Sequence, residues 1–207
     1  MAGSSESITM NSVQKFQQWL LVIVLLMPFS SVWADWELDS TQSAINFISI
    51  KNNGVGEVNS FASLAGSIGA TGNVQIMINL DSVQTLVEVR NERMRELLFQ
   101  TVTFPAAEVT ALIDPAMLAT AAGGDVISAS VPVTLALHGQ EKTMTIAVVA
   151  AGEGDGRLRV FTPRPVIINA SDFGLEKGVA ALKTIAGLQS ISSAIPVTFD
   201  LQFTATP

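Results

Sequence analysis

The chain has 207 residues, with 18 acidic and 11 basic side chains, a formal net charge of −7 and a pI of about 4.6. It contains one His and no Cys, which excludes a disulfide, a thiolate nucleophile, a Cys-ligated zinc site and a His-rich metal site. The acidic balance argues against nucleic acid as a partner, because affinity for phosphate backbones comes mainly from clustered Lys and Arg. Hydrophobic residues make up 48% of the chain and charged residues 14%, so a membrane segment or a very apolar interior must account for the composition.

The N-terminal segment predicts an export signal. A cationic start at Lys15 is followed by the apolar run 19–27, then Pro28 and a stretch of small residues that ends at Ala34. The run is about half of the roughly 20 residues needed to span a bilayer, which favours a cleaved signal peptide over an uncleaved anchor. We therefore expect residues 1–34 to be a signal peptide, with Met10 as an alternative start. Residues 35–207 would then form one periplasmic or secreted domain without stable membrane insertion.

Most of the remaining chain predicts antiparallel strands. Apolar and polar residues alternate with period two over 74–81, 131–138 and 197–204, which is typical of strands with one face in a core and one in water. Weaker strand patterns cover 44–50, 61–70, 107–113, 143–149 and 158–169. Turn residues separate these segments, for example Asn52-Asn53-Gly54 and His138-Gly139. About eight strands at this spacing indicate a closed barrel or a sandwich.

The segment between Leu80 and Pro105 predicts the one helical interruption. At 3.6 residues per turn Leu86, Met94, Leu97 and Leu98 share one stripe, with Asp81 and Ser82 as N-terminal caps of this helix or of the preceding turn. Arg90 falls near the centre of the stripe, where a surface helix normally carries an apolar residue. Two interpretations are open: its methylenes cover the core while the guanidinium reaches water, or the guanidinium points into a cavity mouth and holds an anionic head group. Arg93 borders the same face and would assist.

The chain lacks the common catalytic constellations. His138 precedes Gly139 between two strands, which favours a turn residue over a general base. There is no Gly-x-Ser-x-Gly elbow and no phosphate-binding Gly-x-x-x-x-Gly-Lys loop. We therefore expect a protein that is not an enzyme and needs no cofactor.

Four groups of residues in the same order resemble the YceI-like family of exported polyisoprenoid-binding proteins. The first is the opening Trp36-Glu37-Leu38-Asp39 with the strands that follow, and the second is the stretch Arg90-Asn91-Glu92-Arg93-Met94 with Phe104-Pro105. The third is Leu135-Ala136-Leu137-His138-Gly139, and the fourth is Asn169-Ala170-Ser171-Asp172-Phe173-Gly174. The similarity spans essentially all of the chain after residue 34.

The resemblance implies an all-β fold, an eight-stranded antiparallel lipocalin-like barrel with one helix-containing connection near the mouth. It also implies a long isoprenoid or similar amphiphile in the barrel interior. The chain departs from the family pattern at several positions: Asn91 stands in place of Asp, Arg93 in place of His, Met94 in place of Leu and Ala170 in place of Arg. These differences affect the expected chemistry of head-group binding more than the fold. A polyisoprenoid, an isoprenoid quinone and a fatty-acid-like lipid therefore all stay open as the ligand.

The resulting hypothesis is an exported, non-catalytic carrier that holds one lipid-like small molecule. We expect the head group near Arg90, Asn91 and Arg93. We expect the chain to contact ten apolar side chains: Ile76, Ile78, Leu80, Met94, Leu97, Leu98, Val133, Leu135, Phe199 and Leu201. Alternation alone does not distinguish a lined cavity from a packed core. The alternative is therefore a periplasmic protein-interaction or stress-response module with a packed barrel and no ligand, and either form leaves a homodimer open.

Overall fold

The computed structural model describes residues 35–206, so the predicted signal peptide lies outside the described residues. The strands of this part are β1 Asp35–Leu38, β2 Ala44–Lys51, β3 Val55–Phe61, β4 Leu64–Ile68, β5 Asn73–Asn79, β6 Val83–Gln84, β7 Ala106–Leu112, β8 Val126–Leu137, β9 Gln140–Gly154, β10 Arg157–Phe161, β11 Val166–Asn169 and β12 Ala194–Thr206. The helical segments are η1 Leu80–Ser82, α1 Glu88–Arg93, the π-helical η2 Met94–Phe99, α2 Pro115–Ala122, η3 Ala170–Phe173 and α3 Glu176–Ile185.

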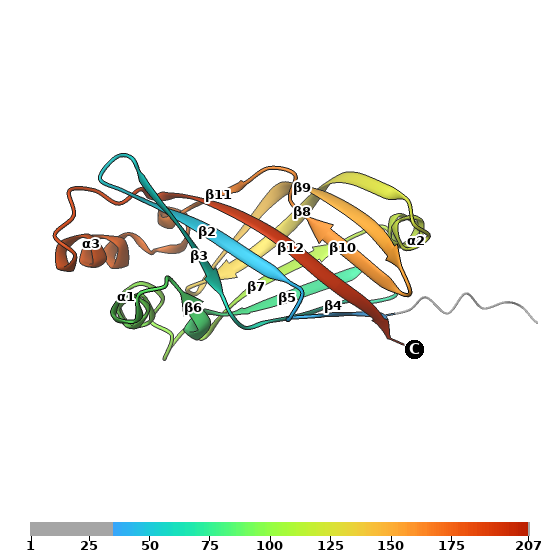
Figure 1. The fold of residues 1–207 in the computed structure, drawn as a ribbon, viewed down its shortest axis with the longest axis horizontal. Helices are drawn as coiled ribbons and strands as arrows, with labels where there is room; N and C mark the ends of the chain where they lie inside the picture. The colour runs from blue at the N-terminus through green and yellow to red at the C-terminus, as the bar shows by residue number, and fades with distance from the viewer. Residues whose placement is uncertain (1–34, 207) are drawn as a thin grey trace, which may run out of the picture. The chain divides into compact units, whose positions relative to one another are not determined.

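The twelve strands of residues 35–206 form a closed barrel of eight antiparallel strands, as predicted (Figure 1). Several barrel strands are interrupted: β12 pairs with β1 through Leu38 and Phe203 and with β2 through Ala44 and Asp200, so β1 and β2 are two parts of one barrel strand. The same holds for β3 with β4, β5 with β6, and β10 with β11. The sheet closes because β1 pairs with both β4 and β12. All of these strand pairs lie within residues 35–206, so the closure of the barrel uses only residues of this part.

The alternating patterns located the strands well. The three clearest predictions coincide with β5, β8 and β12, and the turn at Asn52-Asn53 has both residues at positive φ (50° and 62°). The patterns over 61–70 and 158–169 each predicted one strand, whereas each contains two strand segments. These breaks occur where a barrel strand changes from one set of neighbours to the next.

The helical connection differs in detail from its prediction. Leu86 was expected in the apolar stripe, but α1 begins only at Glu88, and Leu86 has φ +61° and is 94% exposed. From Met94 the helix widens into a π-helix, so a period of 3.6 no longer describes which side chains share a face. The expectation that Asp81 and Ser82 act as N-terminal caps was also wrong: both lie inside η1, and Asn79 caps it by accepting the Asp81 N–H at 3.0 Å.

Two further α-helices, α2 and α3, were not predicted, and they lie at opposite ends of the barrel (Figure 1). Helix α2 begins with Pro115 at its first position and with Asp114 accepting the Ala116 N–H at 2.8 Å. Its Leu118 and Ala121 are buried against the barrel core. Helix α3 packs against η2 at the other end, and the segment that follows α3 contacts the β2–β3 hairpin. Within residues 35–206, no helix has both the length and the apolar character needed to cross a membrane.

The barrel interior is divided into a packed half and a hollow half. On the side of α2 the inward side chains are almost completely buried, as for Phe203, Leu158 and Ile68. On the side of α1 and α3 the inward side chains of β12, Ile195, Val197 and Phe199, are only partly buried. Since these residues point into the barrel, their remaining exposure indicates open space inside it.

Candidate functional site

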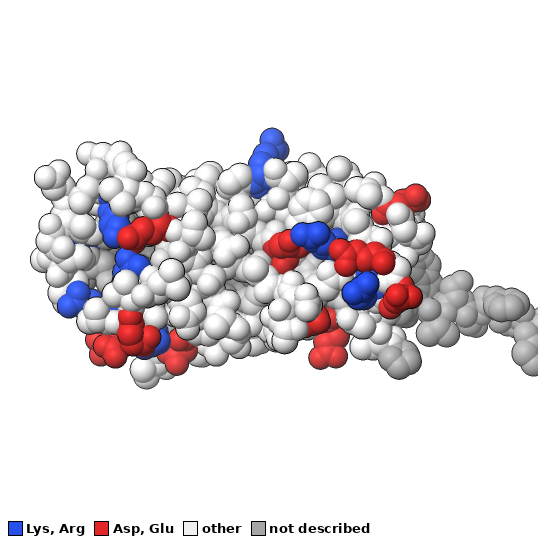
Figure 2. All heavy atoms as spheres, in the orientation of Figure 1, with Lys and Arg blue, Asp and Glu red and all other residues white. Residues whose placement is uncertain are grey.

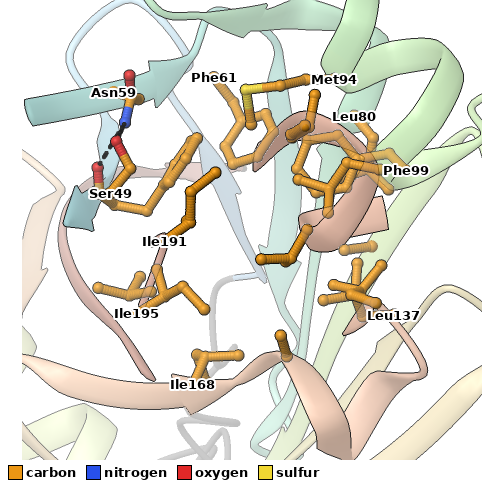
Figure 3. Close-up of a pocket in the computed structure, with 18 of the residues that line it drawn as sticks. Ser49, Asn59, Phe61, Leu80, Met94, Phe99, Leu137, Ile168, Ile191 and Ile195 are labelled. Atoms are coloured by element: carbon orange, nitrogen blue, oxygen red, sulfur yellow. Dashed lines mark hydrogen bonds between the residues drawn. The ribbon is translucent and has the colours of Figure 1, made fainter. Parts of the chain in front are cut away.

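The hollow half of the barrel contains a cavity of about 490 Å³. Its wall is almost entirely apolar and is formed by inward side chains of most barrel strands, by α1 and η2, and by α3 with the connection to β12. Figure 3 shows the labelled side chains Phe61, Leu80, Phe99, Ile168 and Ile195 turned toward a common space. Exposed residues among the lining, such as Val89 and Ile185, place its opening between α1 and α3. We call this opening the mouth.

Seven of the ten side chains expected to contact the ligand chain line this cavity: Ile78, Leu80, Met94, Leu98, Val133, Leu135 and Phe199. The other three do not. Ile76 and Leu201 point inward but belong to the packed half, where they are 4% and 5% exposed. Leu97 lies where α3 packs against η2, with Gly178 placed directly against its backbone.

The wall contributed by α3 and its flanking residues was missed. Leu175, Val179, Leu182 and Ala186 all line the cavity. Their spacing of four, three and four residues is a helical apolar stripe, so a periodicity search over 175–186 would have found it.

Arg90 lines the cavity, but it is already paired. Its guanidinium donates to Glu57 across 2.5 Å and also to the backbone carbonyl of Thr85. Lys51 binds the other carboxylate oxygen of Glu57 at 2.8 Å. The hydrogen bond from Lys51 holds the pKa of Glu57 below its usual range, against the effect of burial, and the positive charge of Arg90 adds to this lowering. Neither interpretation of Arg90 from the sequence included this carboxylate, which lies 33 residues away in the chain.

The two residues grouped with Arg90 have different positions. Arg93 lines the cavity and makes no salt bridge within residues 35–206. Asn91 does not line the cavity and is only 2% exposed. Its Oδ1 accepts from the Thr85 N–H at 2.9 Å and the Thr85 hydroxyl at 2.7 Å, and its Nδ2 donates to Glu88 at 3.1 Å. Asn91 therefore shapes the loop before α1.

Besides Lys51 and Glu57, an uncharged polar pair interrupts the apolar wall on the side of β2 and β3. The Asn59 amide Nδ2 donates to the Ser49 hydroxyl and to the Glu57 backbone carbonyl, each at 3.2 Å (Figure 3). Because the Ser49 oxygen accepts this bond, its own hydrogen stays available to an acceptor in the cavity. Sequence reasoning missed both residues, since a Ser and an Asn on alternating strands carry no distinctive pattern.

His138 occupies the β8–β9 turn with φ +52°, as predicted for a turn residue. Its Nδ1 lies 3.2 Å from the carbonyl oxygen of Phe173 and therefore donates to it. Its ring contacts that of Phe104 in a tilted arrangement, with centroids 4.5 Å apart and an interplanar angle of 53°. Lys142 on β9 forms a salt bridge with Asp172, and this hydrogen bond keeps the pKa of Asp172 low. These contacts attach η3, which leads into α3, to the β8–β9 hairpin.

A closed eight-stranded barrel whose interior cavity is apolar, with a few charged side chains in its lining, has the architecture of lipocalin-like small-molecule-binding proteins. The model of the YceI-like domain matches residues 36–203, so this chain belongs to the YceI-like family. The comparison with curated proteins found no match.

Solved structures agree with this assignment. A polyisoprenoid binding domain from Saccharophagus degradans, implicated in plant cell wall breakdown, is 37% identical and superposes with a TM-score of 0.80, over 83% of this chain and 98% of that chain. Burkholderia cenocepacia BcnA is 21% identical with a TM-score of 0.62, over 80% and 98% of the two chains. The Campylobacter jejuni YCEI protein is 15% identical with a TM-score of 0.52, over 72% and 84%. The last two share the fold.

Proposed function

We propose that this protein is an exported carrier that holds one long-chain amphiphile, of the polyisoprenoid type or a similar lipid, inside its barrel. The observation that carries the proposal is the cavity of about 490 Å³, which is within the range of roughly 300–1,000 Å³ typical of small-molecule sites. Its wall matches a hydrocarbon chain and offers little to a polar metabolite. The similar Saccharophagus degradans domain, which is a polyisoprenoid binding domain, supports the same ligand class.

The charges at the mouth support a polar or anionic head group at that position. Lys51, Arg90 and Arg93 line the cavity together with one carboxylate, Glu57, so the local balance is positive although the whole chain carries −7. Since Glu57 already accepts from Lys51 and Arg90, an anionic head group would compete for these cations, whereas Arg93 makes no salt bridge within residues 35–206. A hydroxyl or carbonyl head group could instead use the Ser49 hydroxyl.

A non-catalytic role is also supported by the lining. The ionisable groups that line the cavity are three cations and Glu57, whose lowered pKa keeps it an ionised acceptor. General acid–base catalysis needs a second group with a complementary proton affinity within reach of the substrate, and the described lining does not provide one. The cavity supports the carrier over the alternative of a packed barrel without a ligand.

Native mass spectrometry of residues 35–207, followed by solvent extraction, tests the carrier function. We expect one bound amphiphile per barrel and exchange with added prenyl lipids or quinones. The double variant Val109→Phe/Val197→Phe adds bulk to the cavity wall and should lose the ligand. The matched variant Thr110→Phe/Thr198→Phe changes the next residues on the same strands, which alternate to the outer face, and should keep it. Absence of ligand in the parent, with no uptake of added lipid, would contradict the proposal.

Two companion measurements test the head group and the export. Arg90→Ala should weaken an anionic ligand markedly and a neutral one little, and equal affinity for an anionic ligand would remove Arg90 from the site. For export, the mass of the protein recovered from the periplasm should correspond to cleavage after Ala34. Recovery of the uncleaved chain in the membrane fraction would instead support the anchor.

A further inference from the structure

Three segments surround the mouth: the β2–β3 hairpin, the loop before α1 with its first turn, and the end of α3 (Figure 1). Each of them carries exposed apolar side chains. We call them the apolar rim: Val55, Val58, Leu86, Val87, Val89 and Ile185. Three of these, Val87, Val89 and Ile185, also line the cavity, so the rim continues the cavity wall onto the outer surface. Exposed apolar groups that gather around an opening are typical of an interaction site.

Leu86 is the most unusual member of the rim. It is 94% exposed and has φ +61°, a backbone conformation that disfavours a branched aliphatic side chain. The loop is nevertheless held firmly, because Asn91 accepts from the backbone and hydroxyl of Thr85 and Arg90 donates to the Thr85 carbonyl. The loop is therefore well anchored, yet Leu86 has an unfavourable positive φ and exposes an apolar side chain to water. This combination indicates that a partner covers Leu86.

The segments of the rim are connected to one another. Asn52 in the β2–β3 hairpin accepts from the backbone N–H of Gln189, after α3, at 2.9 Å. Glu57 connects the same hairpin to α1 through Arg90, and Gly178 places α3 directly against η2. The rim is therefore assembled without a partner, so little conformational entropy is lost when one binds.

Charge is distributed unevenly between the mouth and the remainder of the barrel. The mouth segments 51–58, 86–99 and 175–188 carry six basic and five acidic side chains, whereas the rest of residues 35–206 carries four basic and twelve acidic ones. Figure 2 shows basic and acidic atoms intermixed at the end of the molecule where α1 and α3 lie. Because exposed charges act over about 8 Å at physiological salt, an anionic surface would be approached mouth first.

We propose that the apolar rim docks on the surface of a bilayer that contains anionic phospholipids, with Leu86 inserted among the head groups. An apolar side chain at the interface beside cationic ones is the pattern of proteins that lie on membranes. Docking in this orientation lets an amphiphile pass between bilayer and cavity without exposing its chain to water. Only this last point rests on the proposed carrier function. The rim and the charge distribution are independent of it.

Co-sedimentation of residues 35–207 with vesicles tests the proposal. The probes are vesicles of phosphatidylglycerol with phosphatidylcholine, and of phosphatidylcholine alone. We expect binding to the anionic vesicles that weakens with added salt. Leu86→Asn should reduce it at least about tenfold, because one buried Leu side chain is lost and Asn tolerates positive φ. Leu112→Asn is the matched control, since Leu112 is 68% exposed at the α2 end and should leave binding unchanged.

Thermal unfolding of the two variants separates docking from a role in folding. Since Asn relieves the strained backbone, Leu86→Asn should unfold at the same or a higher temperature than the parent while losing vesicle binding. A parent that does not bind anionic vesicles, or a Leu86→Asn variant that binds as well as the parent, would overturn the proposal. So would a parent dimer that becomes monomeric on Leu86→Asn without vesicle binding, since the rim would then join two copies of the chain. Vesicle binding by a protein that yields no extractable ligand would contradict the carrier function and support docking.

Discussion

Replacing Gly178 with Ala tests whether α3 is positioned by direct contact with the backbone of η2. A Cβ at this position would lie 2.6 Å from the Leu97 carbonyl oxygen and 2.8 Å from the Leu98 Cα, and ordinary contact begins at 3.4 Å. Backbone atoms cannot turn away as a side chain can, so α3 must move outward by about 0.8 Å.

The expected magnitude follows from two opposing effects. Gly to Ala in a helix normally stabilises by about 0.5–1 kcal/mol, because the unfolded chain loses entropy. Forcing extra volume into a packed contact typically costs about 1–3 kcal/mol. We therefore expect Gly178→Ala to destabilise the α3 contact by about 1–2 kcal/mol, which reverses the usual sign for this substitution and corresponds to a factor of about 5–30 in the opening equilibrium.

Amide hydrogen exchange measured by mass spectrometry reports this opening locally. Peptides from α3 should exchange about 5–30-fold faster in Gly178→Ala, while peptides from β7 and β8 keep their rates. Gly54→Ala is the matched control, because nothing lies within 4 Å of the added Cβ, and its effect should stay within about 0.5 kcal/mol. If the amides of α3 exchange no faster in Gly178→Ala than in the parent, the contact with η2 does not position the helix.

Three further predictions concern the two halves of the barrel and the mouth. Phe203→Ala in the packed half should lower the free energy of unfolding, measured by urea denaturation, by about 3–5 kcal/mol. Phe199→Ala should lower it by only about 1–2 kcal/mol, because the Phe199 ring borders open space in the ligand-free protein. Asn91→Ala leaves the buried Thr85 N–H without an acceptor and should cost about 2–3 kcal/mol in the same assay. The hydrogen bond from Lys51 lowers the folded-state pKa of Glu57, so the ionised carboxylate stabilises the fold fully above pH 4.5. This stabilisation is lost as the pH falls through the lowered pKa. Glu57→Gln should therefore flatten the dependence of the unfolding free energy on pH below 4.5.

Each of these has a clear contrary outcome. Equal losses for the two Phe variants would mean that the hollow half is as tightly packed as the other half. An Asn91→Ala variant as stable as the parent would show that its hydrogen bonds are replaced by water. Unchanged pH dependence in Glu57→Gln would mean that the salt bridges with Lys51 and Arg90 contribute no stability.

Local patterns in the sequence determined the strands and most of the cavity wall. Period-two alternation places side chains on one face of a strand regardless of what the strand pairs with, which is why Ile78, Val133 and Leu135 were correctly expected to point inward. The resemblance to the YceI-like family then supplied the barrel, which alternation alone left open between a barrel and a sandwich. The N-terminal export signal stays a prediction from the sequence, because residues 1–34 lie outside the described residues.

Only the tertiary structure decided which inward residues are packed and which face open space. Ile76 and Ile78 are two residues apart on one strand, yet the first belongs to the packed half and the second lines the cavity. Alternation reports the face of a side chain, whereas empty volume depends on the side chains that other elements place beside it. Leu118 and Ala121 of α2 belong to the packed core, whereas Val179 and Leu182 of α3 line the cavity. The tertiary structure likewise brought Glu57 to Arg90, because Coulomb interactions depend on distance in space and these residues lie 33 positions apart in the chain.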